Sequence, residues 1–226
     1  MHQFLFGTFP YIALTILLIG SIARFERDPF TWKSSSSQLL RRKQLIWGSV
    51  LFHVGVLVIF VGHLFGLLVP IEVYDALGVG HGFKQLLAAV GGGVAGLMAL
   101  IGGLMLAHRR FADPRIRATS SFGDNAIILI LIAQLLLGLA TVLISLQHLD
   151  GHEMAKLMAW ANGIITFDGK AASYITETHI LFKLHIALGL LIFAIFPFTR
   201  LVHMLSAPVR YIWRPGFQIV RTRRKF

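Results

Sequence analysis

Four histidines lie inside two stretches that are otherwise apolar, and imidazole is a common ligand of metal ions. His53 and His63 lie in the first stretch, and His185 and His203 lie in the second. An ionisable group inside a membrane is costly and usually marks a functional site. A single ring could simply hydrogen-bond a neighbouring helix, but four rings in two helices favour ligands. Two pairs at two depths suggest two haems.

Helical geometry shows how the two stretches could pair these rings. The ten-residue spacing of His53 and His63 places them about 15 Å apart along a helix axis. The eighteen-residue spacing of His185 and His203 places them on one face, about 27 Å apart. Antiparallel passage sets His53 beside His203 and His63 beside His185. Because the two spans differ, the helices must tilt or bend, and Pro197 offers a kink.

The residues missing from these stretches narrow the chemistry. An iron held by two imidazoles has both axial positions filled, which suits electron transfer rather than oxygen chemistry. The chain has no cysteine, so it can neither attach haem through a C-x-x-C-H motif nor hold a Cys-ligated iron–sulfur cluster. The apolar stretches also lack Asp and Glu, which disfavours a zinc site and a proton or metal transporter.

The composition is that of an integral membrane protein. Of the 226 residues, 56% are hydrophobic and 14% are charged, and the mean hydropathy is +0.73. About 20 apolar residues in a helix cross the hydrocarbon core of a bilayer. The sequence therefore predicts an all-α bundle in a single membrane domain (1–226), with a tail at 206–226 and five transmembrane helices at 4–23, 45–69, 86–107, 125–146 and 180–205. The first run lacks the basic n-region of a signal peptide, so we expect it to remain as a helix.

The basic residues predict an orientation. Seventeen of the 21 Lys and Arg residues lie at 24–43, at 109–117 and from Arg200 onward, and all three segments fall on one side of the membrane. By the positive-inside rule this side is cytoplasmic, which places the N-terminus outside and the C-terminus inside a bacterial cytoplasmic membrane. The same distribution explains the net charge of +11 without a nucleic-acid partner.

Smaller signals concern helix ends, packing and the longest outer loop. Asp113-Pro114 predicts the end of a helix, and Gly123-Asp124 predicts the N-terminal cap of the next one. Gly92 with Gly96 predicts close helix packing. The loop at 147–178 has an amphipathic spacing, which predicts a helix at the outer interface. Four glycines near the histidines could also make room for a flat macrocycle: Gly55, Gly62, Gly66 and Gly189.

The residues around the histidines closely resemble the respiratory nitrate reductase gamma subunits, which are dihaem cytochromes b that anchor membrane-bound nitrate reductases. The likeness covers nearly the whole chain. The residues that carry it lie at 31–32, 51–55, 60–63, 115–119, 147–151, 184–185 and 196–203. Such a long ordered set is a specific signal.

The resemblance implies a function and a set of ligands. His63 and His185 would hold an outer haem b, and His53 and His203 an inner one. Quinol would be oxidised near the outer haem and release its protons to the outside. Electrons would pass through the inner haem to an iron–sulfur beta subunit, and a molybdenum-containing alpha subunit would reduce nitrate to nitrite. Both partners would sit on the cytoplasmic face.

The resemblance also implies a quinol pocket and a docking surface. Gly62, His63 and Lys84 match the pocket, where Lys84 could hydrogen-bond the quinone oxygen or assist proton departure. Lys84 could equally be an interfacial anchor, and the loop at 78–83 departs from the family pattern. The basic tail at 221–225 would dock the partner subunits or bind anionic lipid.

Two rival functions remain open from the sequence. One keeps the two haems but serves another respiratory complex, linked to sulfite or to a heterodisulfide. The other is a haem-free membrane anchor or transporter whose histidines only bond helices together.

Overall fold

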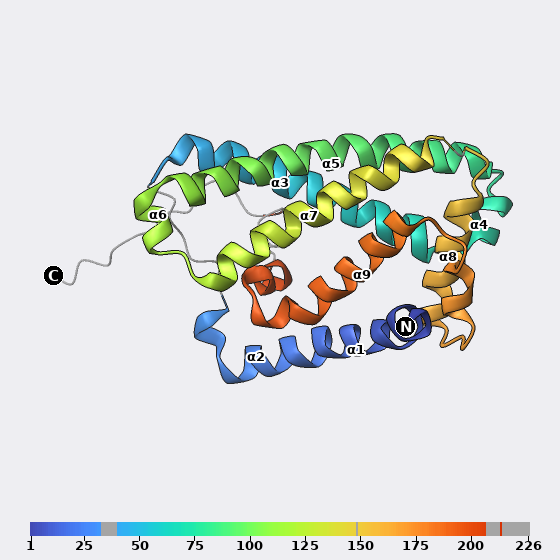
Figure 1. Cartoon of the computed structure of the whole chain (residues 1–226), viewed down its shortest axis with the longest axis horizontal. Helices are drawn as coiled ribbons and strands as arrows, with labels where there is room; N and C mark the ends of the chain where they lie inside the picture. Colours follow the sequence, from blue (N-terminus) through green and yellow to red (C-terminus); the bar gives the residue numbers. More distant parts are fainter. Residues whose placement is uncertain (33–39, 148, 207–212, 214–226) are drawn as a thin grey trace.

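The structure is a computed structural model that describes residues 1–32, 40–147, 149–206 and 213. Five helices in these ranges are long and apolar enough to cross a membrane: Phe4–Arg27, Arg42–Leu68, His81–Ala112, Phe122–Ser145 and Ile180–Phe198. They form one elongated bundle (Figure 1), and the predicted all-α architecture with five spans is confirmed. The predicted basic segment at 221–225 lies outside the described residues, as does His148.

The first span changes its helical type along its length. A π-helical turn (Phe4–Thr8) leads into α1 (Phe9–Thr15), and a second π turn (Ile16–Gly20) leads into α2 (Ser21–Arg27). Pro10 lies in the first turn of α1, inside a continuous helical span, and because it has no N–H it cannot donate to a carbonyl of the preceding turn. A short 3-10 helix (Pro29–Thr31) follows.

The second and third spans pack tightly against each other. The second is α3 (Arg42–His63), which ends in a π turn (Leu64–Leu68), and the third is α5 (His81–Ala112), with α4 (Ile71–Ala76) between them. A Cβ on Gly55 would lie 2.6 Å from the Ala95 carbonyl oxygen, so the missing side chain lets the two backbones meet.

Glycines of α5 behave differently along that helix. A Cβ on Gly96 would lie 2.8 Å from Leu139 of the fourth span, so the packing prediction holds there. At Gly91 and Gly92 nothing lies within 4 Å of such a Cβ. The prediction that Gly92 contributes to close packing is therefore wrong.

Side-chain caps begin the next two helices. Asp113 accepts backbone N–H groups at the start of α6 (Pro114–Ala118). The fourth span, α7 (Phe122–Ser145), begins with a capping box between Ser121 and Asp124. The cap was predicted at Gly123-Asp124, but the N-cap residue is Ser121, two residues earlier. Asp124 is the third residue of the helix and completes the capping box.

The loop predicted to hold an amphipathic helix does so. It forms α8 (His152–Ile165), followed by a 3-10 helix (Ala171–Ile175). The indole Nε1 of Trp160 donates to the Phe6 carbonyl at 2.9 Å, which fastens α8 to the start of the first span.

The fifth span is broken rather than kinked. It comprises α9 (Ile180–Ile195) and a 3-10 turn (Phe196–Phe198), after which Thr199 is extended and a second 3-10 helix runs over Arg200–Ser206. The predicted single helix over 180–205 is wrong. Because proline removes an N–H and clashes with the preceding turn, Pro197 ends the helix, and the rest of the chain takes a new direction.

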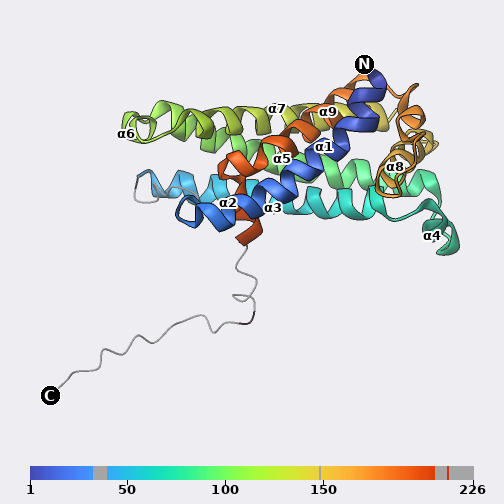
Figure 2. The ribbon, with the colours of Figure 1, turned by 90° about the horizontal axis from the view of Figure 1, so that it is seen from below.

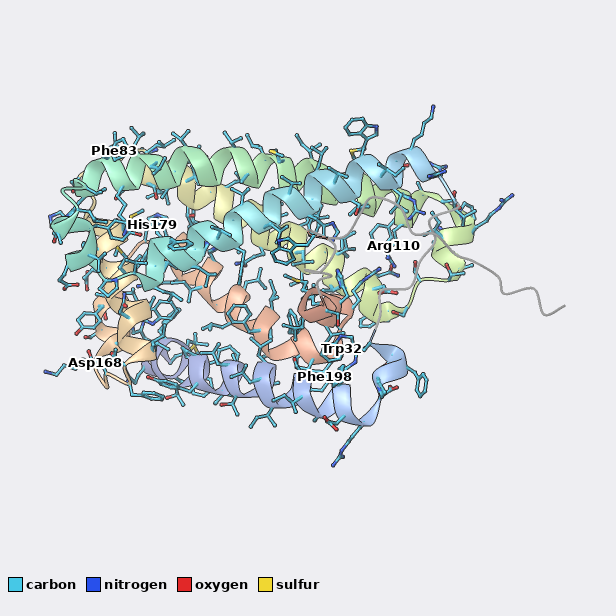
Figure 3. All side chains as sticks on the ribbon, turned by 180° about the vertical axis from the view of Figure 1, so that it is seen from behind. Trp32, Phe83, Arg110, Asp168, His179 and Phe198 are labelled. Atoms are coloured by element: carbon cyan, nitrogen blue, oxygen red, sulfur yellow. The ribbon has the colours of Figure 1, made fainter. Side chains whose placement is uncertain are left out.

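The five spans form an open arc, and the paired histidines of α3 and of the fifth span face its inside. Neighbours pack in the order α3, α5, α7, α9 and the first span. Figure 1 shows α9 lying between α7 and α1, and Figure 2 shows the bundle from below, with α1 and α2 in front. Figure 3 marks the two ends of the bundle by Trp32, Arg110 and Phe198 at one end and by Phe83, Asp168 and His179 at the other. We name these the Trp32 end and the Phe83 end.

Candidate functional site

The structure brings the four inner histidines together in the two pairs that the sequence predicts. The ring centroids of His53 and His203 are 6.2 Å apart, and so are those of His63 and His185. His53 and His203 lie toward the Trp32 end, and the other pair lies toward the Phe83 end. The break at Pro197 reconciles the unequal spans of the two helices, because it carries His203 off the axis of α9.

The spacing within each pair matches two imidazoles that share one metal ion. Bonds from a metal ion to imidazole nitrogen are about 2 Å long, so two rings on opposite sides of one ion have centroids about 6 Å apart. Both pairs meet this requirement without any movement of the helices. Each pair would therefore offer two imidazole nitrogens to the iron of a haem.

Hydrogen bonds fix the ring nitrogens in three of the four histidines. Nδ1 of His53 lies 2.7 Å from the Ser49 carbonyl, and Nδ1 of His63 lies 2.8 Å from the Ile59 carbonyl. Nδ1 of His203 lies 2.5 Å from the carbonyl of Arg200. Because a carbonyl only accepts, each Nδ1 must carry the proton, which leaves the Nε2 lone pair for a metal ion.

His185 has a different environment. The amide Nε2 of Gln134 donates to the His185 carbonyl at 3.1 Å and lies 3.4 Å from the imidazole Nε2. Its Nδ1 is buried and has no hydrogen-bond partner among the described residues. A Cβ on Gly138 would lie 3.0 Å from this ring, so that glycine makes room for it. The sequence analysis missed both Gly138 and Gln134, although both lie in an apolar run that faces α9.

The space beside His63 is open, as a bulky cofactor requires. His53 and His63 are exposed in the isolated chain, whereas His185 and His203 are half-buried. Nothing lies within 4 Å of a Cβ built on Gly62 or on Gly66. These two glycines therefore fit the prediction of room for a macrocycle.

The other two glycines of that prediction have packing roles. Gly55 faces α5, as described above, and a Cβ on Gly189 would lie 3.3 Å from the Gln134 amide nitrogen. The open space thus lies along the α3 face near His63 and not around every glycine near a histidine.

The donor set suits haem better than a bare metal ion. In the ranges that the structure describes, no three His, Asp or Glu side chains are grouped to hold a metal. Each pair therefore offers two nitrogens, and a porphyrin supplies the other four. The paired rings, the open space beside Gly62 and the unpartnered Nδ1 of His185 all fit such a group.

Lys84 of α5 is buried, and it lies close to the end of the second span. Its Nζ donates to the Gly66 carbonyl at 3.3 Å, contacts the Met158 sulfur at 2.7 Å, and lies 3.7 Å from the centre of the Tyr74 ring. Only 7% of the residue is exposed, so a simple interfacial anchor is not what the structure shows. Tyr74 and Met158 are neighbours that the sequence analysis did not identify.

A second polar pair, His81 and Asp75, lies near Lys84. Nε2 of His81, one turn before Lys84, lies 2.7 Å from a carboxylate oxygen of Asp75. His81 and Lys84 both line one small cleft, together with Ile71 of α4 and Met154 and Met158 of α8. Of the segment 78–83, His81 lines this cleft.

The Trp32 end has a cationic cluster around a single carboxylate. Asp124 lies 3.6 Å from Arg110 and 3.5 Å from Arg200. These contacts join α5, α7 and the 3-10 helix that carries His203. Basic groups thus gather at the end predicted to be cytoplasmic.

Comparisons with known proteins agree along the whole chain. A sequence model described as nitrate reductase gamma subunit matches residues 2–223. The chain is 44% identical over 223 residues to the respiratory nitrate reductase 1 gamma chain of Escherichia coli K12, covering 99% of this chain and 98% of that one. It is 46% identical to the respiratory nitrate reductase 2 gamma chain of the same organism, with the same coverage. It is 38% identical to the nitrate reductase gamma chain of Bacillus subtilis 168, covering 94% and 95%.

Proposed function

Because the chain belongs to the family of nitrate reductase gamma subunits, we propose that it takes electrons from quinol and carries them across the membrane to a partner subunit. As a gamma chain it is the cytochrome b subunit of a respiratory nitrate reductase, and the catalytic reduction lies on another subunit. It is a multi-pass protein of the bacterial inner membrane. The family match favours this complex over one linked to sulfite or to a heterodisulfide.

The two histidine pairs would hold two haems b. His63 and His185 would provide the axial ligands of the outer haem, and His53 and His203 those of the inner one. When bound, haem b would supply a carrier of single electrons. The observation that carries this proposal is the 6.2 Å separation of the ring centroids in both pairs.

Quinol would bind beside His63 at the Phe83 end. The Lys84 ammonium lies at this level, where its Nζ donates to the Gly66 carbonyl at 3.3 Å. Lys84 would hydrogen-bond a quinol oxygen and hold it in place while two protons leave toward the outer side. Both electrons would then move inward, one at a time.

The Trp32 end would face the cytoplasm and the partner subunits. The basic residues of this end support that orientation through the positive-inside rule. Without cysteine the chain cannot provide the next iron–sulfur centre, so a beta subunit must receive the electrons. An alpha subunit with molybdenum would complete the reduction of nitrate to nitrite.

Single histidine substitutions test the ligand assignment. In membranes that contain the assembled complex, we expect His63→Ala to remove the outer haem and leave the inner one. Dithionite-reduced minus oxidised spectra and the number of haems per chain would report this, with a fall from two haems to about one. His152→Ala, an exposed histidine of α8, is the matched control and should keep both. Loss of neither haem, or equal loss of both, would contradict the assignment.

A further inference from the structure

We propose that Arg24 and Trp32, at the inner end of the first span, are positioning residues for the inner haem ligand His203. We call these two residues the bracket. The proposal rests on the assignment of His203 as a ligand. It gives a role to the first span, which contains none of the four paired histidines.

The broken fifth span creates the need for such a device. Where α9 ends before Pro197, backbone carbonyls lose their partners in the helix, and an unpaired polar group is costly inside a membrane. His203 lies beyond the break, on a 3-10 helix of seven residues (Arg200–Ser206). A helix this short has little stability of its own, so its position must be fixed from outside.

Arg24 fixes the entry to this 3-10 helix. Its Nη1 donates to the carbonyls of Pro197 at 2.6 Å and Thr199 at 2.8 Å, and its Nη2 donates to the Thr31 carbonyl at 2.9 Å. One planar guanidinium thus binds carbonyls on both sides of the break and also the Thr31 carbonyl, which lies in the segment after the first span. A lysine ammonium lacks this rigid fork.

Trp32 fixes the exit. Its indole Nε1 donates to the Ser206 hydroxyl at 2.5 Å. The same indole packs against the buried cluster that contains Phe196, Leu201 and Val202. The ring of Phe25 meets it edge-on, with centroids 5.4 Å apart. The start of the His203 helix is therefore tied to the inner end of the first span through Arg24, and its end is tied to the following segment through Trp32.

The bracket acts on His203 through one backbone group. Nδ1 of His203 donates to the Arg200 carbonyl, and that carbonyl lies one peptide beyond the Thr199 carbonyl held by Arg24. Such a hydrogen bond sets both the direction of the ring and its strength as a metal ligand. Displacement of this backbone would turn the imidazole away from His53.

Close packing supports the same contact between segments. A Cβ on Gly20 would lie 2.9 Å from the Pro197 ring, so a glycine is needed where the first span passes the break. The outer pair differs, because His185 lies within α9 and His63 is the last residue of α3, which continues directly as a π turn. The bracket should therefore matter for the inner haem alone.

The test compares four variants in membranes that contain the assembled complex. Arg24→Ala and Arg24→Lys remove the fork, and the second keeps the positive charge. Trp32→Phe removes the indole N–H and keeps an aromatic ring. Arg27→Ala changes an exposed arginine one turn further along α2 and is the matched control. Redox titration and electron paramagnetic resonance (EPR) would follow each haem separately.

We expect both Arg24 variants to shift the potential and the EPR signal of the inner haem, or to lower its occupancy, with the outer haem unchanged. Trp32→Phe should give a smaller shift in the same haem, and Arg27→Ala none. Rescue by Arg24→Lys would show that charge alone matters, and equal damage to both haems would indicate general unfolding. Either result would overturn the proposal.

His203→Ala separates this inference from the assignment on which it rests. If His203→Ala leaves the inner haem intact, the assignment of the ligand fails. If His203→Ala removes that haem and the Arg24 variants leave it unaltered, only the bracket fails.

Discussion

The two histidine pairs differ in the angle between their rings. The planes of His53 and His203 are 71° apart, whereas those of His63 and His185 are 35° apart. The relative orientation of two axial imidazoles controls the splitting of the iron d orbitals, and this splitting sets the anisotropy of the EPR signal. The two haems should therefore be distinguishable.

We predict that the inner haem gives the larger maximum g value, because its ligand planes are closer to perpendicular. Low-temperature EPR of oxidised membranes would measure both signals, and His53→Ala should remove the one at higher g. Two identical signals, or loss of the lower one in that variant, would contradict the ring angles.

Lys84 should matter for quinol and not for haem. Loss of one hydrogen bond from a charged group costs about 1.5–3 kcal/mol, so Lys84→Met should lower kcat/KM for quinol about tenfold to a hundredfold. Steady-state assays with a soluble quinol would measure this, and both haem bands should persist. Lys170→Met, at an exposed lysine of the outer loop, should behave like the unaltered chain. An unchanged kcat/KM in Lys84→Met would remove Lys84 from the pocket.

The sequence alone could predict which histidines pair, but not what surrounds them. Helical rise and antiparallel passage place His53 opposite His203 by geometry that every helix shares. Arg24 and Gln134 donate to backbone carbonyls that are far away in the chain. Those contacts depend on how the helices pack, and no local pattern records this.

Among the elements, the contact between α3 and α5 is the most sensitive to added volume. A Cβ on Gly55 would lie 2.6 Å from the Ala95 carbonyl oxygen and 2.7 Å from the Ala99 nitrogen, and neither backbone atom can give way alone. We predict that Gly55→Ala destabilises the fold by about 1–3 kcal/mol.

The temperature at which detergent-solubilised protein loses its haem absorbance would measure this effect. Gly91→Ala is the control, because nothing lies within 4 Å of a Cβ there and alanine favours a helix. It should leave that temperature unchanged or slightly higher. Equal behaviour of the two variants would mean that α3 and α5 do not pack as described.

The turn after α8 should respond to acid. The backbone N–H of Lys170 and the Tyr174 hydroxyl both donate to Asp168 and lower the pKa of its carboxyl group. Since the folded-state pKa is lowered, the stabilisation is present at neutral pH and is lost as the pH falls through that lowered value. Hydrogen-exchange protection of residues 166–175 should therefore decline below about pH 4. In Asp168→Asn the protection should no longer change over that range, and a persistent decline would assign the effect to another group.

The elements show where local sequence signals suffice. Long apolar runs fix the existence of the five spans, because each must satisfy its backbone internally. The end of the fifth helix was predicted too late, because the sequence pattern does not show whether a proline in a membrane helix produces a kink or ends the helix. Here the helix ends, and Arg24 binds carbonyls on both sides of the break.

For the whole molecule, the orientation in the membrane can be measured directly because the chain has no cysteine. Lys170→Cys lies in the loop at the Phe83 end, and Arg115→Cys lies in α6 at the other end. We predict that a membrane-impermeant maleimide labels the first in intact cells and the second only after permeabilisation. Labelling of Arg115→Cys in intact cells would reverse the proposed topology and the direction of proton release.

The open arc of helices has a consequence for how much of the protein a cell can keep. The histidines of α3 and of the fifth span face each other across the inside of the arc, so a tightly bound haem would link these two spans. A ligand that binds only the folded chain stabilises it by mass action. When iron or porphyrin is scarce, newly made chains would therefore stay incompletely folded and be degraded by membrane proteases. The amount of this subunit in the membrane would then depend on the supply of iron and porphyrin.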